Sequence, residues 1–176
     1  MVRGDNAVEY LPDSAVDEAL DRELRELLTV CFTKPQDTVF KAQRYFRQPY
    51  RHRWVIRDEA GRLSAHAGVH EKRIEADGRH WPIGGVAEVC VRPDCRGRGY
   101  VKAMLACAHE WMTGNGATFS VLFGRPEVYA SSGYASVDNL VHDADNGERQ
   151  SVKALVKVLT DVPWPAGVVY LPGPKF

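Results

Sequence analysis

The sequence predicts an α+β fold, with a mixed, mostly antiparallel central sheet flanked by helices. Short apolar segments with strand-like patterns recur along the whole chain. Two longer stretches, 15–32 and 100–113, instead carry apolar residues at three- and four-residue spacing, which is typical of helices that cover a sheet. No repeat, low-complexity segment or linker interrupts the 176 residues, so we expect a single domain spanning 1–176.

The N-terminal part of the chain predicts one strand and two helices. Residues 8–11 form a short apolar strand pattern. The break Pro12-Asp13-Ser14 offers a capping residue to the helix 15–32, whose apolar side chains share one face. A second helical stretch is expected over 36–47, and it ends before Pro49.

The central part predicts three strands, at 54–57, 64–74 and 80–91. Asp77-Gly78 lies between the last two and is a strong hairpin signal, because both positions tolerate a positive φ. Pro82 lies near the start of the third strand and interrupts its pattern.

The remaining elements alternate between strands and one short helix. Beyond the helix 100–113 they are a strand at 119–123, a helix at 126–133, and strands at 134–137, 152–159 and 168–171. The polar stretch 143–151 is expected to be a loop.

Composition excludes several function classes. The 23 basic and 23 acidic side chains give a net charge of zero, which disfavours nucleic-acid or membrane-surface partners. No apolar run approaches the roughly 20 residues of a membrane span, and residues 1–6 lack the apolar core of a secretory signal. The four cysteines show neither disulfide nor metal-ligand spacing. We therefore expect a cytoplasmic protein with reduced thiols and no metal.

The stretch 89–105 combines a strand, a tight loop and a helix. In the loop, Gly97 and Gly99 alternate with Arg96 and Arg98. Glycine lets a ligand lie against the backbone, and the N–H groups at a helix start attract anions. Two common phosphate motifs do not fit, since the third glycine of a dinucleotide fingerprint and the Gly-Lys-Ser/Thr of a P-loop are both missing.

The run 91–99 reads V-R-P-D-C-R-G-R-G and resembles the V-x-P-x-x-R-G-x-G form of the pyrophosphate loop of GNAT acetyltransferases. Downstream, Tyr129, Gly133 and Tyr134 match the family's Y-x-x-x-G-F/Y motif position by position. The resemblance covers roughly residues 64–137. It implies the GNAT fold, an N-acetyltransferase activity, and acetyl-CoA as acyl donor without a metal.

The resemblance also implies a set of coenzyme-binding residues. The loop would hold the pyrophosphate, and the strand before it would pair with the pantetheine arm and supply an N–H to the oxyanion. The implied cofactor-binding residues are Val89, Cys90, Val91, Arg96, Gly97, Arg98, Gly99, Tyr100 and Val101.

Two residues are expected to move protons. Tyr129 is expected to be the general acid, because a phenol with a pKa of about 10 can protonate a thiolate whose conjugate acid has a pKa of about 8.5. Glu88 is the candidate base, although family members often carry the carboxylate one position earlier, where this chain has Ala87. An offset of one residue turns a side chain to the other face of a strand, and a bulge at this point would compensate for it.

Other residues remain open as the base. His66 and His70 fall on one face of the strand 64–74 and could join a water relay. The C-terminal carboxylate of Phe176 is a further option, because some relatives end their chains in the acceptor site.

The acceptor is expected to be a primary amine of a small molecule. Residues 65–69 and 129–131 resemble aminoglycoside 2′-N-acetyltransferases, and 164–167 resembles nodulation acyltransferases that act on amino sugars. The segment 34–54 is rich in arginine, lysine and aromatic residues and would repel a polycation if these side chains face the acceptor. A longer-chain N-acyltransferase acting on an amino sugar and a catalytically silent CoA-binding domain remain the alternatives, and a homodimer is left open.

Overall fold

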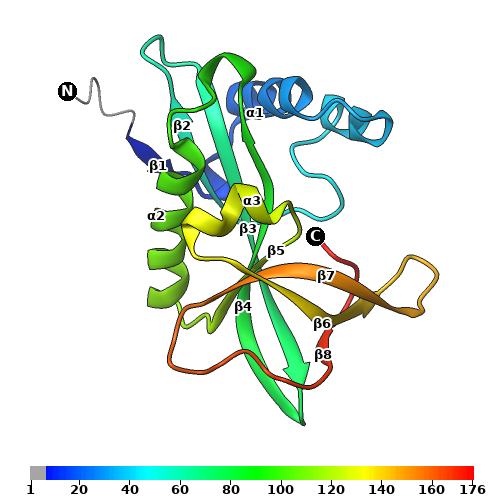
Figure 1. Cartoon of the computed structure of the whole chain (residues 1–176). Helices are drawn as coiled ribbons and strands as arrows, with labels where there is room; N and C mark the ends of the chain where they lie inside the picture. Colours follow the sequence, from blue (N-terminus) through cyan, green and yellow to red (C-terminus); the bar gives the residue numbers. More distant parts are fainter. Residues whose placement is uncertain (1–6) are drawn as a thin grey trace. The chain divides into compact units, whose positions relative to one another are not determined.

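A computed structural model describes residues 7–176 of the chain (Figure 1). The chain divides into two compact units, one of Met1–Val69 with Glu88–Ala108 and one of His70–Ala87 with His109–Phe176. Two strands and one helix contribute residues to both units, and the single domain remains a prediction. The signal-free N-terminus expected for residues 1–6 lies outside the described residues.

The structure contains the predicted strands and the two long helices. The strands are β1 (Val8–Tyr10), β2 (His52–Arg57), β3 (Leu63–Ala76), β4 (Arg79–Val91), β5 (Phe119–Leu122), β6 (Ala135–Asp143), β7 (Arg149–Val158) and β8 (Val169–Leu171). The helices are α1 (Glu18–Cys31), α2 (Tyr100–Gly114) and α3 (Pro126–Tyr129), with 3-10 turns at Asp13–Ala15, Pro35–Lys41, Pro93–Cys95 and Ala130–Ser132.

The first unit packs α1 onto antiparallel strands. β1 pairs with β2, and β2 pairs with β3, both antiparallel. Helix α1 begins where the Asp17 carboxylate accepts a hydrogen bond from the Leu20 N–H at 2.8 Å. Its leucines 24, 27 and 28 are fully buried in a cluster that also holds Phe40 and Cys90. The helix therefore forms because one face is buried, as its apolar spacing predicts.

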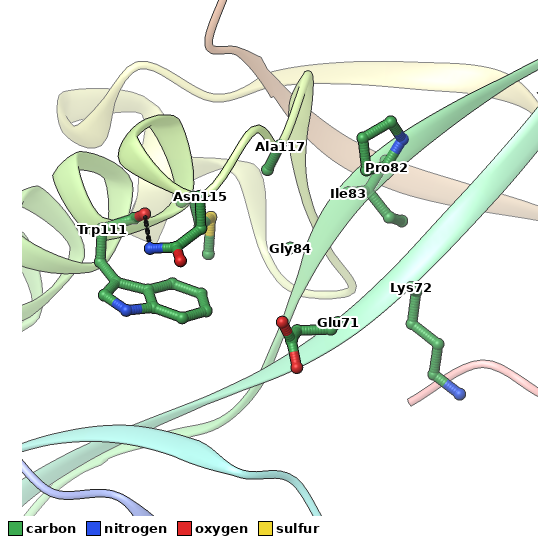
Figure 2. Close-up of a pocket in the computed structure, with 9 residues that line it drawn as sticks. Glu71, Lys72, Pro82, Ile83, Gly84, Trp111, Asn115 and Ala117 are labelled. Atoms are coloured by element: carbon green, nitrogen blue, oxygen red, sulfur yellow. Dashed lines mark hydrogen bonds between the residues drawn. The ribbon is translucent and has the colours of Figure 1, made fainter.

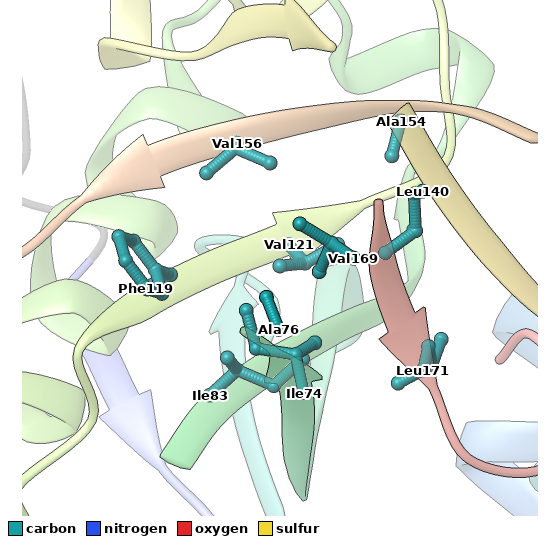
Figure 3. Packing of buried hydrophobic residues seen from close by; sticks show 10 residues of the cluster. All are labelled: Ile74, Ala76, Ile83, Phe119, Val121, Leu140, Ala154, Val156, Val169 and Leu171. Carbon is teal, nitrogen blue, oxygen red and sulfur yellow. The ribbon is translucent and has the colours of Figure 1, made fainter. Parts of the chain in front are cut away.

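The second unit contains the parallel pairings. β5 runs parallel to β4 and antiparallel to β7, while β6 runs antiparallel to β7 and parallel to β8. Figure 3 shows the core of this unit, where Phe119 and Val121 of β5 face Val156 of β7 and Ile74 of β3. The mixed, mostly antiparallel sheet of the predicted α+β class is confirmed.

The hairpin between β3 and β4 forms at the predicted turn. Asp77 and Gly78 have φ angles of 50° and 71°, so both adopt the left-handed conformation that a two-residue hairpin turn requires. β4 continues without a break past Pro82, although the sequence pattern is interrupted there.

Two predicted elements are wrong. The helix expected over 36–47 is only a 3-10 turn, Pro35–Lys41, followed by bends. Its backbone instead places the Arg44 guanidinium on the Asp13 and Asp21 carboxylates at 2.8–2.9 Å. The loop expected over 143–151 is shorter, because β6 and β7 pair up to Asp143 and Arg149.

Candidate functional site

The glycine-arginine loop is an exposed turn that leads into α2. Gly97 and Gly99 have φ angles of 75° and 77°, which favour glycine on conformational grounds. A Cβ atom at either position would meet no atom within 4 Å in the structure, so the backbone is open to a ligand. Arg96 and Arg98 lie on the same exposed loop.

The charges of this loop suit an anion. Helix α2 begins at Tyr100 and directs its first N–H groups and the positive end of its dipole toward the loop. The Arg96 Nε–H donates to the Val91 carbonyl at 3.3 Å, and the acidic Asp94 is bound by the Arg62 guanidinium at 2.8 Å. The loop therefore presents positive charge and backbone N–H groups, which attract anions.

The strand residues before the loop offer their backbone rather than their side chains. The β4–β5 ladder pairs Ile83–Val86 of β4, so the predicted pantetheine-binding residues Val89–Val91 lie beyond the paired part. Cys90 is buried, and the hydrogen bond that its thiol donates to Cys31, together with burial, raises the pKa of this thiol well above the usual value. The Cys90 thiol is therefore not a nucleophile at neutral pH.

Glu88 occupies a distorted position in β4. Its φ angle is 45°, and Asp77 is the other described non-glycine residue with a positive φ. A left-handed glutamate in a strand costs on the order of 1 kcal/mol and re-aims the side chain. Such a distortion is required if the Glu88 carboxylate is to lie on the strand face where family members place theirs.

The surroundings of Glu88 shift the pKa of its carboxyl group. Burial raises the pKa of its carboxyl group to about 7, although a hydrogen bond from Tyr50, the Phe46 N–H and the positive charge of Arg53 all act to lower it. A carboxyl group with this pKa is partly ionised at neutral pH and can accept a proton there. These partners precede Glu88 by 35 or more residues, and their only sequence signal is the basic, aromatic composition of 34–54.

His66 holds the backbone at Glu88 and does not suit a proton relay. Its Nδ1–H donates to the Glu88 carbonyl at 2.8 Å, and its Nε2 lies 3.4 Å from the Tyr50 hydroxyl. Burial lowers the pKa of His66 to about 3, so the ring is neutral at physiological pH. His70 belongs to the second unit, where burial and the charge of Lys72 lower its pKa to about 4.

Tyr129 ends helix α3 in the second unit. Its ring lies 6.1 Å from the Tyr134 ring, and a Cβ atom on Gly124 would approach it to 2.7 Å. Gly133 closes the following turn with a φ angle of 89°. The matched motif residues Tyr129, Gly133 and Tyr134 thus lie together around one turn, which we call the aromatic corner.

The Tyr134 hydroxyl contacts two residues that the sequence pattern does not single out. It lies 2.8 Å from His109 Nε2 and 2.7 Å from Ser120 Oγ, and all three residues are buried. Burial raises the pKa of Tyr134, so the phenol stays protonated. This network anchors the corner that carries Tyr129.

The Phe176 ring packs within the second unit. It lies 5.5 Å from the His70 ring and 5.1 Å from the Phe123 ring, and a Cβ atom on Gly85 would come within 2.5 Å of it. These contacts fix the ring, and the option of a carboxylate base at this residue stays untested.

A separate pocket of the second unit contains none of the predicted site residues. Figure 2 shows its walls, with Trp111 and Asn115 facing Gly84, and the Asn115 amide donating to the Trp111 carbonyl at 2.8 Å. Within residues 7–176, no cluster of three or more histidine, cysteine or acidic residues could hold a metal ion. No helix in the same range is both long and apolar enough to cross a membrane.

The predicted residues divide between the units. Glu88, Val89–Val91 and the loop 96–101 belong to the first unit, and Tyr129 belongs to the second. Sequence reasoning missed Tyr50 and Arg53 as partners of Glu88, and it missed His109 and Ser120.

A family model matches most of the chain. The model of the acetyltransferase (GNAT) domain family matches residues 14–137. The chain is similar to the GNAT family N-acetyltransferase YhbS from Escherichia coli in complex with CoA, with a TM-score of 0.63, 18% identity, and coverage of 97% of this chain and 93% of that one.

Two further solved structures are similar. For a GNAT family acetyltransferase from Brucella melitensis in complex with acetyl-CoA, the TM-score is 0.59 at 16% identity, over 93% of this chain and 95% of that one. For the ribosomal-protein-S18-alanine N-acetyltransferase from Escherichia coli, the TM-score is 0.55 at 12% identity, over 89% and 97%. At these identities the likeness concerns the fold. No curated protein matches the sequence.

Proposed function

The chain belongs to the GNAT acetyltransferase family, and we propose that it is an N-acetyltransferase that transfers an acetyl group from acetyl-CoA directly to a primary amine of a small molecule. The family match covers residues 14–137, and similar structures were solved with CoA and acetyl-CoA bound. The exposed loop at the start of α2 has the open backbone and the cations that a coenzyme diphosphate needs.

The observation that carries the proposal is the half-buried carboxylate of Glu88 with a pKa of about 7. An amine is protonated in neutral water and must lose a proton to become a nucleophile. A carboxylate tuned to this pH is suited to accept that proton, whereas an ordinary exposed glutamate is too weak a base.

The proposed reaction runs through one ternary complex. The amine nitrogen attacks the thioester carbonyl carbon while Glu88 accepts the amine proton. A backbone N–H in 89–91 stabilises the tetrahedral oxyanion. The intermediate collapses with cleavage of the carbon–sulfur bond, and Tyr129 protonates the leaving thiolate. The products are an amide and free CoA thiol.

The structure weakens one argument about the acceptor. The basic composition of the segment 34–54 predicts repulsion of a polycationic amine, but Arg44 is paired with Asp13 and Asp21, and Arg53 is paired with Asp13. These carboxylates therefore neutralise part of the charge of the two arginines. We propose a small-molecule amine without restricting it to anionic or aromatic acceptors.

The test combines binding with turnover. Calorimetry with acetyl-CoA should give micromolar or tighter binding, and a screen of amines should release CoA thiol for at least one acceptor. Absence of coenzyme binding would refute the proposal. Binding without thiol release over a broad amine library would favour a silent CoA-binding domain, and faster release from octanoyl-CoA than from acetyl-CoA would favour a longer-chain acyltransferase.

A further inference from the structure

Arg53 is a buried cation with incomplete hydrogen bonding. It lies in β2 opposite Gly68, and its side chain is 1% exposed. Its Nη2 donates to the Asp13 carboxylate at 2.7 Å, and its guanidinium carbon lies 5.2 Å from the centre of the Tyr50 ring. Among residues 7–176, its buried Nε and Nη1 have no hydrogen-bond partner. Burying a charge in this way costs free energy unless the charge is paired with an opposite charge.

Glu88 has a buried acceptor atom that also lacks a hydrogen bond. Its Oε2 atom is likewise buried and without a hydrogen-bond partner in the described part of the chain. The Arg53 guanidinium lies over the Tyr50 ring, the Tyr50 hydroxyl lies 3.4 Å from His66 Nε2, and His66 Nδ1–H donates to the Glu88 carbonyl at 2.8 Å. These four residues therefore form one polar cluster of the first unit.

Gly68 makes the cluster possible. A Cβ atom at Gly68 would come within 2.5 Å of the Tyr50 ring, so the absence of a side chain admits this ring between the strand and the guanidinium. The ring in turn fixes the plane of Arg53 by a cation–π contact.

The remaining groups around Glu88 supply no competing charge. The neutral His66 comes from β3, the protonated Cys90 thiol from β4, and Tyr50 and the Phe46 N–H from the segment before β2. Arg44 contributes its carbonyl to the Tyr50 hydroxyl, while its guanidinium is held by Asp13 and Asp21.

We propose that Arg53 is a positioning residue for Glu88. The buried guanidinium of Arg53 is the counter-charge that keeps the Glu88 carboxylate ionisable in its distorted strand position. Asp13 orients the guanidinium but neutralises its charge only in part, because the Asp13 carboxylate is shared with Arg44. This inference rests on the proposed role of Glu88 as the base. It assigns to β2 a residue that tunes the reaction without touching the acceptor.

The direct test measures the pKa of Glu88 in the intact protein. Carbon-13 NMR of protein labelled at the glutamate carboxyl carbons gives this value, and Glu88→Gln assigns the signal. Arg53→Gln should raise the pKa of Glu88 by about one unit, which leaves about tenfold less carboxylate well below the pKa. Arg53→Lys should restore most of the shift. Arg51→Gln removes an exposed arginine two positions away and should leave the signal unchanged.

A second variant should shift the pKa of Glu88 in the opposite direction. Asp13→Asn removes the carboxylate that partly neutralises Arg53, so the pKa of Glu88 should fall. This variant keeps the test informative if Arg53→Gln does not fold. An unchanged Glu88 pKa in Arg53→Gln, or a rise in Asp13→Asn, would overturn the inference.

The pH dependence of turnover distinguishes a failure of this inference from a failure of the proposed function. If Glu88 is the base, the acid limb of kcat/KM against pH should move upward in Arg53→Gln by the same amount as the NMR titration, with the KM for acetyl-CoA unchanged. If the NMR titration moves while Glu88→Gln keeps full activity, the coupling to Arg53 stands and the base role fails.

Discussion

Glu88→Gln should make the protein more stable at high pH while removing its base. The pKa of Glu88 is about 7 in the folded protein, against a reference of 4.5. Because the folded state holds this proton more tightly than the unfolded chain, Glu88 destabilises the fold progressively as pH rises from about 4.5 to 7. At 1.36 kcal/mol per pKa unit, the full cost above pH 7 is about 3 kcal/mol.

A glutamine at this position is neutral at every pH, so it does not add the free-energy cost of burying an ionised carboxylate. Urea unfolding at pH 8 should therefore show Glu88→Gln to be more stable than the natural sequence by up to about 3 kcal/mol, and at pH 5 the gain should shrink to about 1 kcal/mol. Glu59→Gln, at an exposed turn, is the control and should show no pH-dependent difference.

The same pKa sets the rate profile. If the carboxylate is the active form, kcat/KM at pH 6 should be about one tenth of its high-pH plateau, and Glu88→Gln should lower kcat about 100-fold or more. A variant that is less stable than the natural sequence at pH 8 would refute the reasoning about burial, whatever its activity.

Three further changes test the remaining residues. Tyr129→Phe should lower kcat about 100-fold with little change in coenzyme affinity, and an unchanged rate would remove Tyr129 as the acid. Gly97→Val should weaken acetyl-CoA binding more than about tenfold by calorimetry, because a β-branched side chain covers the open backbone and strains a positive φ. Gly147→Val, at a φ of 81° in the turn between β6 and β7, is its matched control and should bind normally. Gly68→Ala should lower the free energy of unfolding by about 1–3 kcal/mol because its methyl group meets the Tyr50 ring, and an unchanged urea midpoint would contradict this.

Much of the fold was predictable because its signals are local. The hairpin at Asp77-Gly78 needs only two residues that tolerate a positive φ. The helix that begins at Tyr100 needs only its own apolar spacing and the glycine loop before it. The helix 36–47 failed for the opposite reason, because Arg44 is drawn to Asp13 and Asp21, which lie far away in sequence.

The sequence by itself determined the family, and it predicted the coenzyme loop and the two residues expected to move protons, because each depends on residue types at short fixed spacings. The tertiary structure alone decided the chemical state of Glu88. A pKa depends on burial and on charges within a few ångströms, and Tyr50, Phe46 and Arg53 reach Glu88 only after the chain has folded. The backbone angle of 45° that re-aims this glutamate is likewise held by His66 from the neighbouring strand β3.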